Sequence, residues 1–252
     1  MEILYGRQAL METLRAGRRT YHRLLVAEGM QMTGLPAEIL RLAHHRRVPV
    51  ATVEKRDLDR MTANGHHQGL ALETGAYPWV EFDALLGTAT PAAEPPFLLV
   101  LDHVQDPQNV GSMMRSADAA GVGGVILPRD RACAVTPAVV RASSGAVEHM
   151  QVAQVTNLVR AIAELKEKRI WVYALEALPE APLHTDVRLD GAAAIVVGNE
   201  GQGVGRLVRQ TCDGVLRLPM RGKVGSLNAA VAAAIALYEV RRQRDAALPP
   251  PA

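Results

Sequence analysis

Two short apolar runs near the carboxyl end, at residues 194–197 and 215–218, constrain the fold of this chain more than any other feature. They are too short and too rich in β-branched side chains for helices, which favours strands buried in a parallel sheet. Each run is followed by a polar, glycine-rich loop and then by a helical pattern. Loops at the carboxyl ends of parallel strands converge on one crevice, where α/β proteins bind ligands. We interpret the two loops as a ligand site because they carry Asn199, Glu200, Ser226 and Asn228 among residues with almost no side chain.

The same alternation extends back to residue 97. Apolar runs predict four further strands, at residues 97–102, 124–127, 152–155 and 170–174. Helical spacing predicts helices between them, at residues 110–120, from 137, and at 157–168. Strands that alternate with helices indicate a parallel sheet with both faces covered. A last helix, from Ser226 to about residue 244, is apolar on most faces and must be buried in the core or against a second subunit.

Residues 1–75 predict a separate small α/β unit. Its expected helices lie at residues 7–16, 36–45 and 55–61, and its expected strands at 23–27, 48–53 and 69–73. Dense prolines predict a linker over residues 76–96, with one helical turn around residues 82–86. The second domain then covers residues 97–246, and a proline-rich tail covers 247–252.

The composition is that of a soluble globular protein, with 252 residues of which 48% are hydrophobic and 21% charged. No apolar run approaches the roughly 20 residues of a membrane helix, and no signal-peptide pattern opens the chain, so we expect no membrane partner and a cytoplasmic location. Cys133 and Cys212 lack metal-ligand spacing, which argues against a metal and favours buried thiols.

The formal net charge of +2 is unevenly distributed. Residues 1–75 carry 11 Lys and Arg against 8 Asp and Glu, residues 76–200 carry 9 against 15, and residues 201–252 carry 8 against 3. The three segments therefore have net charges of +3, −6 and +5. This pattern indicates either a localised surface for a polyanion or scattered charge on solvated helices.

A motif that points to chemistry runs from Asn109 to Arg115, where a predicted strand is followed by a helix. Asp106 or Asn109 has the side chain to cap that helix. Arg115 lies about a turn and a half further on, beside small and apolar residues. It is either a solvated arginine or a guanidinium at the crevice, where two hydrogen bonds would hold a phosphate or a developing oxyanion.

The two carboxyl-terminal loops supply the other candidates. The glycines of Gly198-Asn-Glu-Gly-Gln-Gly203 allow the backbone to approach a ligand closely, and no Gly-Lys-Ser/Thr follows, so this is not a P-loop. Glu200 would bind a ligand ammonium group or orient Arg115, unless it is an ordinary loop carboxylate. We expect Ser226 to be the N-cap of the last helix. Asn228 either faces the site or is a solvated amide that assists the cap.

Three long motifs resemble one known family. The segments L-D-H-V-Q-D-P-Q-N-V-G-S-M-M-R-S-A-D-A-A-G-V, I-V-V-G-N-E-G-Q-G-V and L-P-M-R-G-K-V-G-S-L-N-A-A-V-A are similar to the signature motifs of the SpoU (TrmH) RNA ribose 2′-O-methyltransferases of the SPOUT superfamily. Residues 1–75 resemble the ribosomal-protein-like RNA-binding domain of the ribosomal RNA members, close to the bacterial RlmB type that methylates a guanosine of large-subunit RNA. The departures are His103, where other residues are common, and Ala229-Ala230, in place of a Val-Ser pair.

The resemblance implies a parallel-sheet catalytic domain with a deep carboxyl-terminal trefoil knot, and a homodimer with the knot helices at its interface. The two-fold axis then places an active site near both subunits. The cofactor implied is S-adenosylmethionine, bound largely through backbone groups. By motif, the cofactor-binding residues are Gly198, Asn199, Glu200, Leu218, Met220, Ser226 and Leu227.

The same resemblance implies roles in catalysis. Arg115 would deprotonate the ribose hydroxyl or stabilise the alkoxide, Asn109 and Glu200 would orient Arg115, the ribose or the cofactor, and Asn228 would hold the nucleotide. RNA would be bound by five arginines of the first domain: Arg7, Arg18, Arg19, Arg46 and Arg47. The alternatives are a transfer-RNA methyltransferase of the same family, a resistance-type ribosomal methyltransferase, and a non-catalytic RNA-binding or ribosome-assembly protein of the same fold.

Overall fold

The computed structural model describes residues 1–88 and 94–247. The chain divides into two compact units. The first combines Met1–Pro78 with Val135–His149, and the second combines Trp79–Ala134 with Met150–Ala252. No helix in the described residues is both long enough and apolar enough to cross a membrane.

The first unit is built on a four-stranded sheet with the order β1-β4-β2-β3. Its elements are β1 (Glu2–Tyr5), α1 (Arg7–Ala16), β2 (Tyr21–Ala27), α2 (Leu35–His45), β3 (Val50–Val53), α3 (Lys55–Met61) and β4 (Leu70–Thr74). Strand β2 pairs parallel with β3 and antiparallel with β4. Leu58 of α3 packs against Leu25 and Ala71. The predicted helices and strands are present, and β1 is an additional strand, which its antiparallel pairing with β4 stabilises.

A segment distant in sequence completes the first unit. Helix α6 (Pro137–Ala142) and the 3-10 helix η1 (Ala146–His149) pack against α1 and β1. The hydroxyl of Tyr77 donates to the carbonyl of Val147 at 3.0 Å. Between the two helices, a Cβ on Gly145 would lie 2.6 Å from Cβ of Glu12, so only glycine fits there. Residues 135–149 thus lie outside the compact unit formed by the rest of the predicted 97–246 domain.

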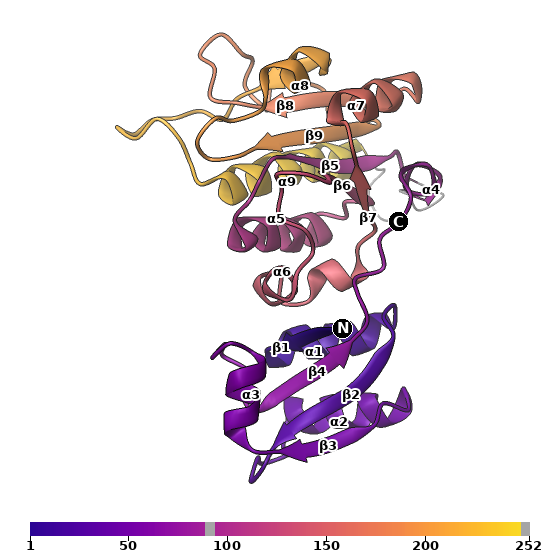
Figure 1. Ribbon diagram of the computed structural model, residues 1–252. Coiled ribbons are helices and arrows are strands. Elements are labelled where there is room, and N and C mark those ends of the chain that lie inside the picture. The colour runs from indigo at the N-terminus through magenta and orange to yellow at the C-terminus, as the bar shows by residue number, and fades with distance from the viewer. Residues whose placement is uncertain (89–93, 248–252) are drawn as a thin grey trace. The chain divides into compact units, whose positions relative to one another are not determined.

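The second unit contains a six-stranded sheet in which every pair of neighbours is parallel, with the order β10-β8-β9-β5-β6-β7. Its strands are β5 (Phe97–Asp102), β6 (Gly124–Pro128), β7 (Val152–Val155), β8 (Trp171–Leu175), β9 (Ala193–Gly198) and β10 (Gly214–Leu216). Helices α5 (Pro107–Ala119) and α9 (Ala229–Ala247) cover one face, and α4 (Phe82–Thr88), α7 (Leu158–Glu167) and α8 (Arg206–Thr211) cover the other (Figure 1). This confirms the predicted parallel α/β fold.

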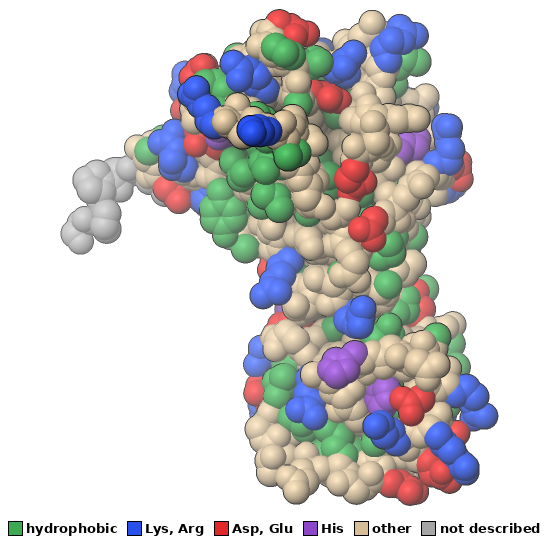
Figure 2. All heavy atoms as spheres, turned by 90° about the vertical axis from the view of Figure 1, so that its left-hand side faces the viewer, with side chains coloured by type: hydrophobic (Ala, Val, Ile, Leu, Met, Phe, Trp, Pro, Cys, Tyr) green, Lys and Arg blue, Asp and Glu red, His purple; other side chains and the backbone are tan. Residues whose placement is uncertain are grey.

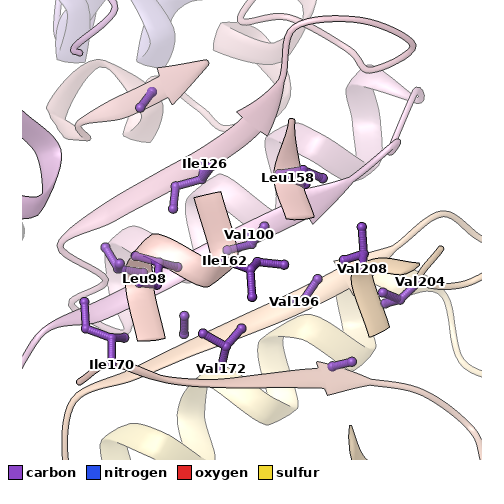
Figure 3. Close-up of a cluster of buried hydrophobic side chains, with 14 of the residues drawn as sticks. Leu98, Val100, Ile126, Leu158, Ile162, Ile170, Val172, Val196, Val204 and Val208 are labelled. Atoms are coloured by element: carbon purple, nitrogen blue, oxygen red, sulfur yellow. The ribbon is translucent and has the colours of Figure 1, made fainter. Parts of the chain in front are cut away.

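The core beneath α7 and α8 explains why these helices form where they do (Figure 3). Leu158, Ile162 and Leu165 recur at helical spacing on α7 and are buried against the sheet. From the sheet, Leu98 and Val100 of β5 point toward this cluster. Side chains alternate along a strand, so the next residue on that face is Asp102, at the carboxyl end of β5.

The structure differs from the sequence analysis at two boundaries. The helical turn expected within the proposed linker, residues 76–96, is the helix α4, which belongs to the second unit, and Leu85 on that helix is fully buried. Residues 89–93 of that segment lie outside the described residues. The last helix begins at Ala229, not at Ser226, because the side chain of Asn228 caps it: Oδ1 accepts the N–H of Ala230 at 2.9 Å.

Candidate active site

The second unit has its topological switch point between β5 and β9. Asp102 and Gly198 are register partners at the ends of these two strands. From β5 the chain continues to β6 and β7 on one side, whereas β9 is followed by β10 on the other side, beyond β8. Loops that leave neighbouring strands in opposite directions open a crevice, and open parallel sheets bind ligands there.

A cavity of about 300 Å³ lies at this end of the sheet. Its lining comes from the ends of β8 and β9, from the loop after β10 and from the start of α9: Leu175, Glu176, Ala177, Val197, Gly198, Asn199, Glu200, Gly201, Gln202, Gly203, Leu218, Met220, Ser226, Leu227, Ala229 and Ala232. These include all seven residues predicted to bind the cofactor. Apolar walls with a few polar groups are typical of small-molecule sites.

Backbone contacts shape the loop after β9. A Cβ on Gly198 would lie 2.0 Å from the carbonyl carbon of Gly203, so the two glycines lie almost in contact. Oδ1 of Asn199 accepts the N–H groups of Gly201 at 3.0 Å and Gln202 at 2.8 Å. The N–H of Val204 donates to Oε1 of Glu176 at 2.5 Å. Asn199 thus holds the loop in a tight turn and leaves its backbone facing the cavity.

Asn109 joins the two loops by its side chain. Its Nδ2 donates to Oε1 of Glu200, and its Oδ1 accepts from Nδ2 of Asn228 at 2.9 Å. Asn109 lies in the first turn of α5, whose N-cap is Asp106, with Oδ1 accepting the N–H of Gln108 at 3.0 Å. Three of the predicted catalytic residues therefore form one hydrogen-bonded chain, although they lie 91 and 119 residues apart in sequence.

Arg115 is placed differently from the other three. It lies on the exposed face of α5, and it is not among the described residues that line the cavity. Arg115 comes six positions after Asn109, so its side chain points about 120° away from that of Asn109 around the helix.

Asp102 and Glu176 are functional candidates that our sequence analysis missed. Asp102 is 1% exposed; its Oδ2 accepts the N–H of Gly205 at 2.7 Å, and its Oδ1 accepts from Nδ1 of His103. The sequence does contain a pattern that could have identified them, because each carboxylate directly follows a buried apolar run. Asp102 ends the run L-V-L-D, and Glu176 ends the run Y-A-L-E. Such a carboxylate needs a partner, and here both find backbone N–H groups.

The five arginines predicted to bind RNA differ in their exposure. Arg19 is a correction: its guanidinium is fully buried against Glu148 and Glu2, so it cannot reach RNA. Arg7, Arg18 and Arg46 are half-buried or exposed and donate to backbone carbonyls, and Arg47 is exposed.

The two cysteines, for which we predicted buried thiols, are half-buried. Burial raises the pKa of Cys133 and raises that of Cys212 to about 12.

Two family models and a set of curated relatives match this chain. Residues 96–238 match the SpoU rRNA methylase family, and residues 3–80 match the RNA 2′-O ribose methyltransferase substrate-binding family. Over 246 residues the chain is 42% identical to YacO of Bacillus subtilis (strain 168), which is assigned to the TrmH family of tRNA/rRNA methyltransferases; the match covers 97% of this chain and 96% of YacO.

Two solved structures show how far the fold is shared. The SpoU methyltransferase AviRb from Streptomyces viridochromogenes, in complex with AdoMet, has a TM-score of 0.80 at 24% identity, over 97% of this chain and 90% of AviRb. The A. aeolicus TrmH/SpoU tRNA modifying enzyme has a TM-score of 0.54 at 24% identity, over 66% of this chain and 83% of its own.

The fold and site define an RNA-modifying methyltransferase. The chain belongs to the SpoU (TrmH) family of RNA 2′-O-ribose methyltransferases, enzymes that use S-adenosylmethionine. The resemblance seen in the three sequence motifs is confirmed.

Proposed function

We propose that this enzyme methylates the ribose 2′-hydroxyl of a guanosine in large-subunit ribosomal RNA. The chain formed by Asn109, Glu200 and Asn228 beside the cavity is the observation that carries the enzymatic part of this proposal. The ribosomal target is supported by residues 96–238, which match the SpoU rRNA methylase family, and by the tRNA modifying enzyme from A. aeolicus, which matches only 66% of this chain. The additional part of the chain suits a large, folded RNA.

The cavity fits the cofactor. Leu218, Met220 and Leu227 provide apolar surface for an adenine ring, while the turn after Gly198 supplies backbone polar groups. The carboxylates of Glu176 and Glu200 suit the positive charges of an ammonium or sulfonium group. When bound, S-adenosylmethionine supplies an activated methyl group.

The task left to the protein is to orient the ribose hydroxyl and to assist loss of its proton. A guanidinium remains protonated at neutral pH, so Arg115 acts best by fixing a neighbouring phosphate and stabilising the developing alkoxide. Asn109 links Glu200 to Asn228, so that the two loops keep one geometry around the reacting groups. The non-catalytic alternative would be favoured if these residues were lost, and all are present.

Arginines of the first unit would bind RNA, with Arg7, Arg18, Arg46 and Arg47 retained from the predicted set and Arg19 removed. We also propose that the enzyme is cytoplasmic. The segment around the cavity would form the trefoil knot of the family.

A homodimer through α9 completes the proposal. Exposed apolar side chains recur every three or four residues from the preceding loop along this helix: Val224, Leu227, Val231, Ile235 and Tyr238. Hydrophobic side chains gather on the side of this unit where α9 lies (Figure 2). Their exposure ranges from 39% to 71%, and a continuous apolar stripe on a helix needs a partner surface. In sedimentation velocity, the wild type should be a dimer and Ile235→Lys should shift it to a monomer.

The function is tested by transfer of radiolabelled methyl groups to unmodified ribosomal RNA and, separately, to transfer RNA, followed by nucleoside analysis. We expect 2′-O-methylguanosine in large-subunit RNA only. Label only in transfer RNA would show that the enzyme is a transfer-RNA methyltransferase, the alternative within the same family. No label in either RNA or in a large-subunit particle, with cofactor binding intact, would favour the non-catalytic alternative.

A further inference from the structure

A second cavity lies on the other side of the loop after β9. It has a volume of about 560 Å³, and its walls include His103, Gln105 and Arg131 together with the turn from Asn199 to Gly203. That turn also lines the cofactor cavity, so the two cavities share one wall. Nothing in the proposed reaction uses His103 or Arg131.

The buried carboxylate of Asp102 holds His103 in place. Asp102 is 1% exposed and accepts from Nδ1 of the imidazole and from the N–H of Gly205. Nδ1 must carry a proton to donate to this carboxylate, so the imidazole presents Nε2 as its free ring nitrogen. The described residues offer Nε2 no hydrogen-bond partner, and the side chain is 34% exposed.

The backbone at His103 is also unusual. Its φ is 56°, in the left-handed region that residues other than glycine rarely adopt. Asparagine and glycine also adopt this conformation, so the backbone by itself does not require an imidazole here.

Arg131 also lines this cavity, from the loop after β6. The loop that carries it is tied to the loop of His103, because Nε2 of Gln105 donates to the carbonyl of Arg131 at 3.3 Å and the N–H of Cys133 donates to the carbonyl of Val104 at 2.9 Å. Within residues 1–88 and 94–247 its guanidinium forms no ion pair. A fixed imidazole and an uncompensated guanidinium suit a ligand with an aromatic base and a phosphate.

We propose that this cavity binds an unpaired nucleotide of the RNA that flanks the methylated ribose. Arg131 binds its phosphate, and His103 contacts its base by stacking or through Nε2. This inference rests on the proposed function, since the shared turn from Asn199 to Gly203 would lie between the flanking nucleotide and the cofactor. Sequence-specific recognition of RNA relies on unpaired bases of this kind.

The test measures binding of a 5′-fluorescein-labelled, single-stranded RNA of twelve nucleotides and mixed sequence by fluorescence anisotropy, over a range of salt concentrations. Arg131→Ala should weaken binding by about 5-fold to 10-fold and lower the slope of log K against log salt by about 0.7, the value for one phosphate contact on a single strand. His103→Asn should weaken binding by about 5-fold with the slope unchanged, because a neutral contact is lost. Asparagine suits the left-handed backbone, so this variant isolates the imidazole.

Lys168→Ala is the matched control. It removes one exposed positive charge after α7, at the amino end of β8 and therefore at the opposite edge of the sheet, and it should bind RNA within 2-fold of the wild type. Cofactor affinity, measured by calorimetry, should be the same in all variants. Wild-type affinity and slope in both Arg131→Ala and His103→Asn would overturn the inference. Methyl transfer by the wild-type enzyme is measured in parallel: its absence would refute the proposed function, while the RNA-binding result would still decide the inference.

Discussion

Arg19 and Glu148 lie 129 residues apart in sequence and form a buried ion pair within the first unit. Nη2 of Arg19 lies 2.7 Å from Oε1 of Glu148, and neither side chain is exposed to solvent. Burial lowers the pKa of Arg19, but the hydrogen bonds and charge of Glu148 and Glu2 more than reverse this, so the pKa is raised. The substrate-binding unit therefore depends on a carboxylate supplied from between β6 and β7.

Loss of this carboxylate should be strongly destabilising. Glu148→Ala leaves a buried guanidinium with only Glu2 as its carboxylate partner, and removing one partner of a buried ion pair costs about 3–5 kcal/mol of unfolding free energy. Urea denaturation of the full chain measures the loss. Glu180→Ala, which removes an exposed carboxylate, should change stability by less than about 0.5 kcal/mol. A loss below 1 kcal/mol for Glu148→Ala would show that the pair is not needed. For the same reason, deletion of residues 1–75 would unpair Glu148, and point variants test RNA binding more cleanly.

Arg115→Ala should lower kcat by about 100-fold to 1,000-fold while cofactor binding remains within 2-fold of the wild type. Because Arg115 is exposed and lies outside the cofactor cavity, its loss should leave cofactor binding intact, and the proposed stabilisation of the alkoxide by its guanidinium predicts the loss of rate. Single-turnover methylation and calorimetry give the two quantities. Arg115→Lys, which keeps the charge but loses the planar pair of donors, should recover only part of the rate. Near-normal turnover in the alanine variant would remove Arg115 from the mechanism.

Asn228 has two functions that a pair of substitutions can separate. Its Oδ1 caps α9, and its Nδ2 donates to Asn109. Serine is a good cap but cannot reach Asn109, so Asn228→Ser should keep the melting temperature and lower kcat. Asn228→Ala should also lose about 1 kcal/mol of stability. Thermal unfolding and turnover are measured on both variants. Equal turnover in Asn228→Ser and the wild type would mean that the contact with Asn109 has no part in catalysis.

The turn after β9 should tolerate a methyl group at one glycine and not at another. Gly198→Ala would place its Cβ 2.0 Å from the carbonyl carbon of Gly203, so the turn must open. At Gly201 the nearest heavy atom to an added Cβ is 3.6 Å away, an ordinary contact. We expect Gly198→Ala to weaken cofactor binding by at least 10-fold and Gly201→Ala to have little effect in calorimetry. Similar affinities in the two variants would contradict this account of the cavity.

Cys212 should be unreactive in the folded enzyme. Burial raises its pKa to about 12, so at pH 8 only about one thiol in 10,000 is ionised, and the thiolate is the reactive form. Because the pKa is raised, the thiolate fraction of Cys212, and with it the rate of its modification, increases only as the pH approaches 12. Iodoacetamide labelling followed by mass spectrometry should show slow modification of Cys212 at pH 8 and rapid modification in urea. Complete labelling of the folded protein within minutes would rule out the raised pKa.

Local patterns in the sequence were sufficient for most elements. Apolar runs and helical spacing located the strands and helices of the sheet because burial on both faces requires nearly continuous apolar segments. Glycine-rich loops after β9 and β10 pointed to the cofactor cavity, since parallel strands bring their carboxyl ends to one edge. By contrast, the sequence did not predict that Leu85 in the presumed linker would be buried, because the partner that covers it, Gly124, lies 39 residues away.

What the sequence alone determined is the set of elements, the two polar loops and, through three long motifs, the family. What only the tertiary structure decided is which polar side chains meet. It joined Asn109 to both Glu200 and Asn228, assigned Arg19 to a buried ion pair instead of an RNA contact, and paired Asp102 with His103. Periodicity records which residues are buried, but a polar contact depends on distance and direction between groups far apart in the chain, and those exist only after the strands have paired.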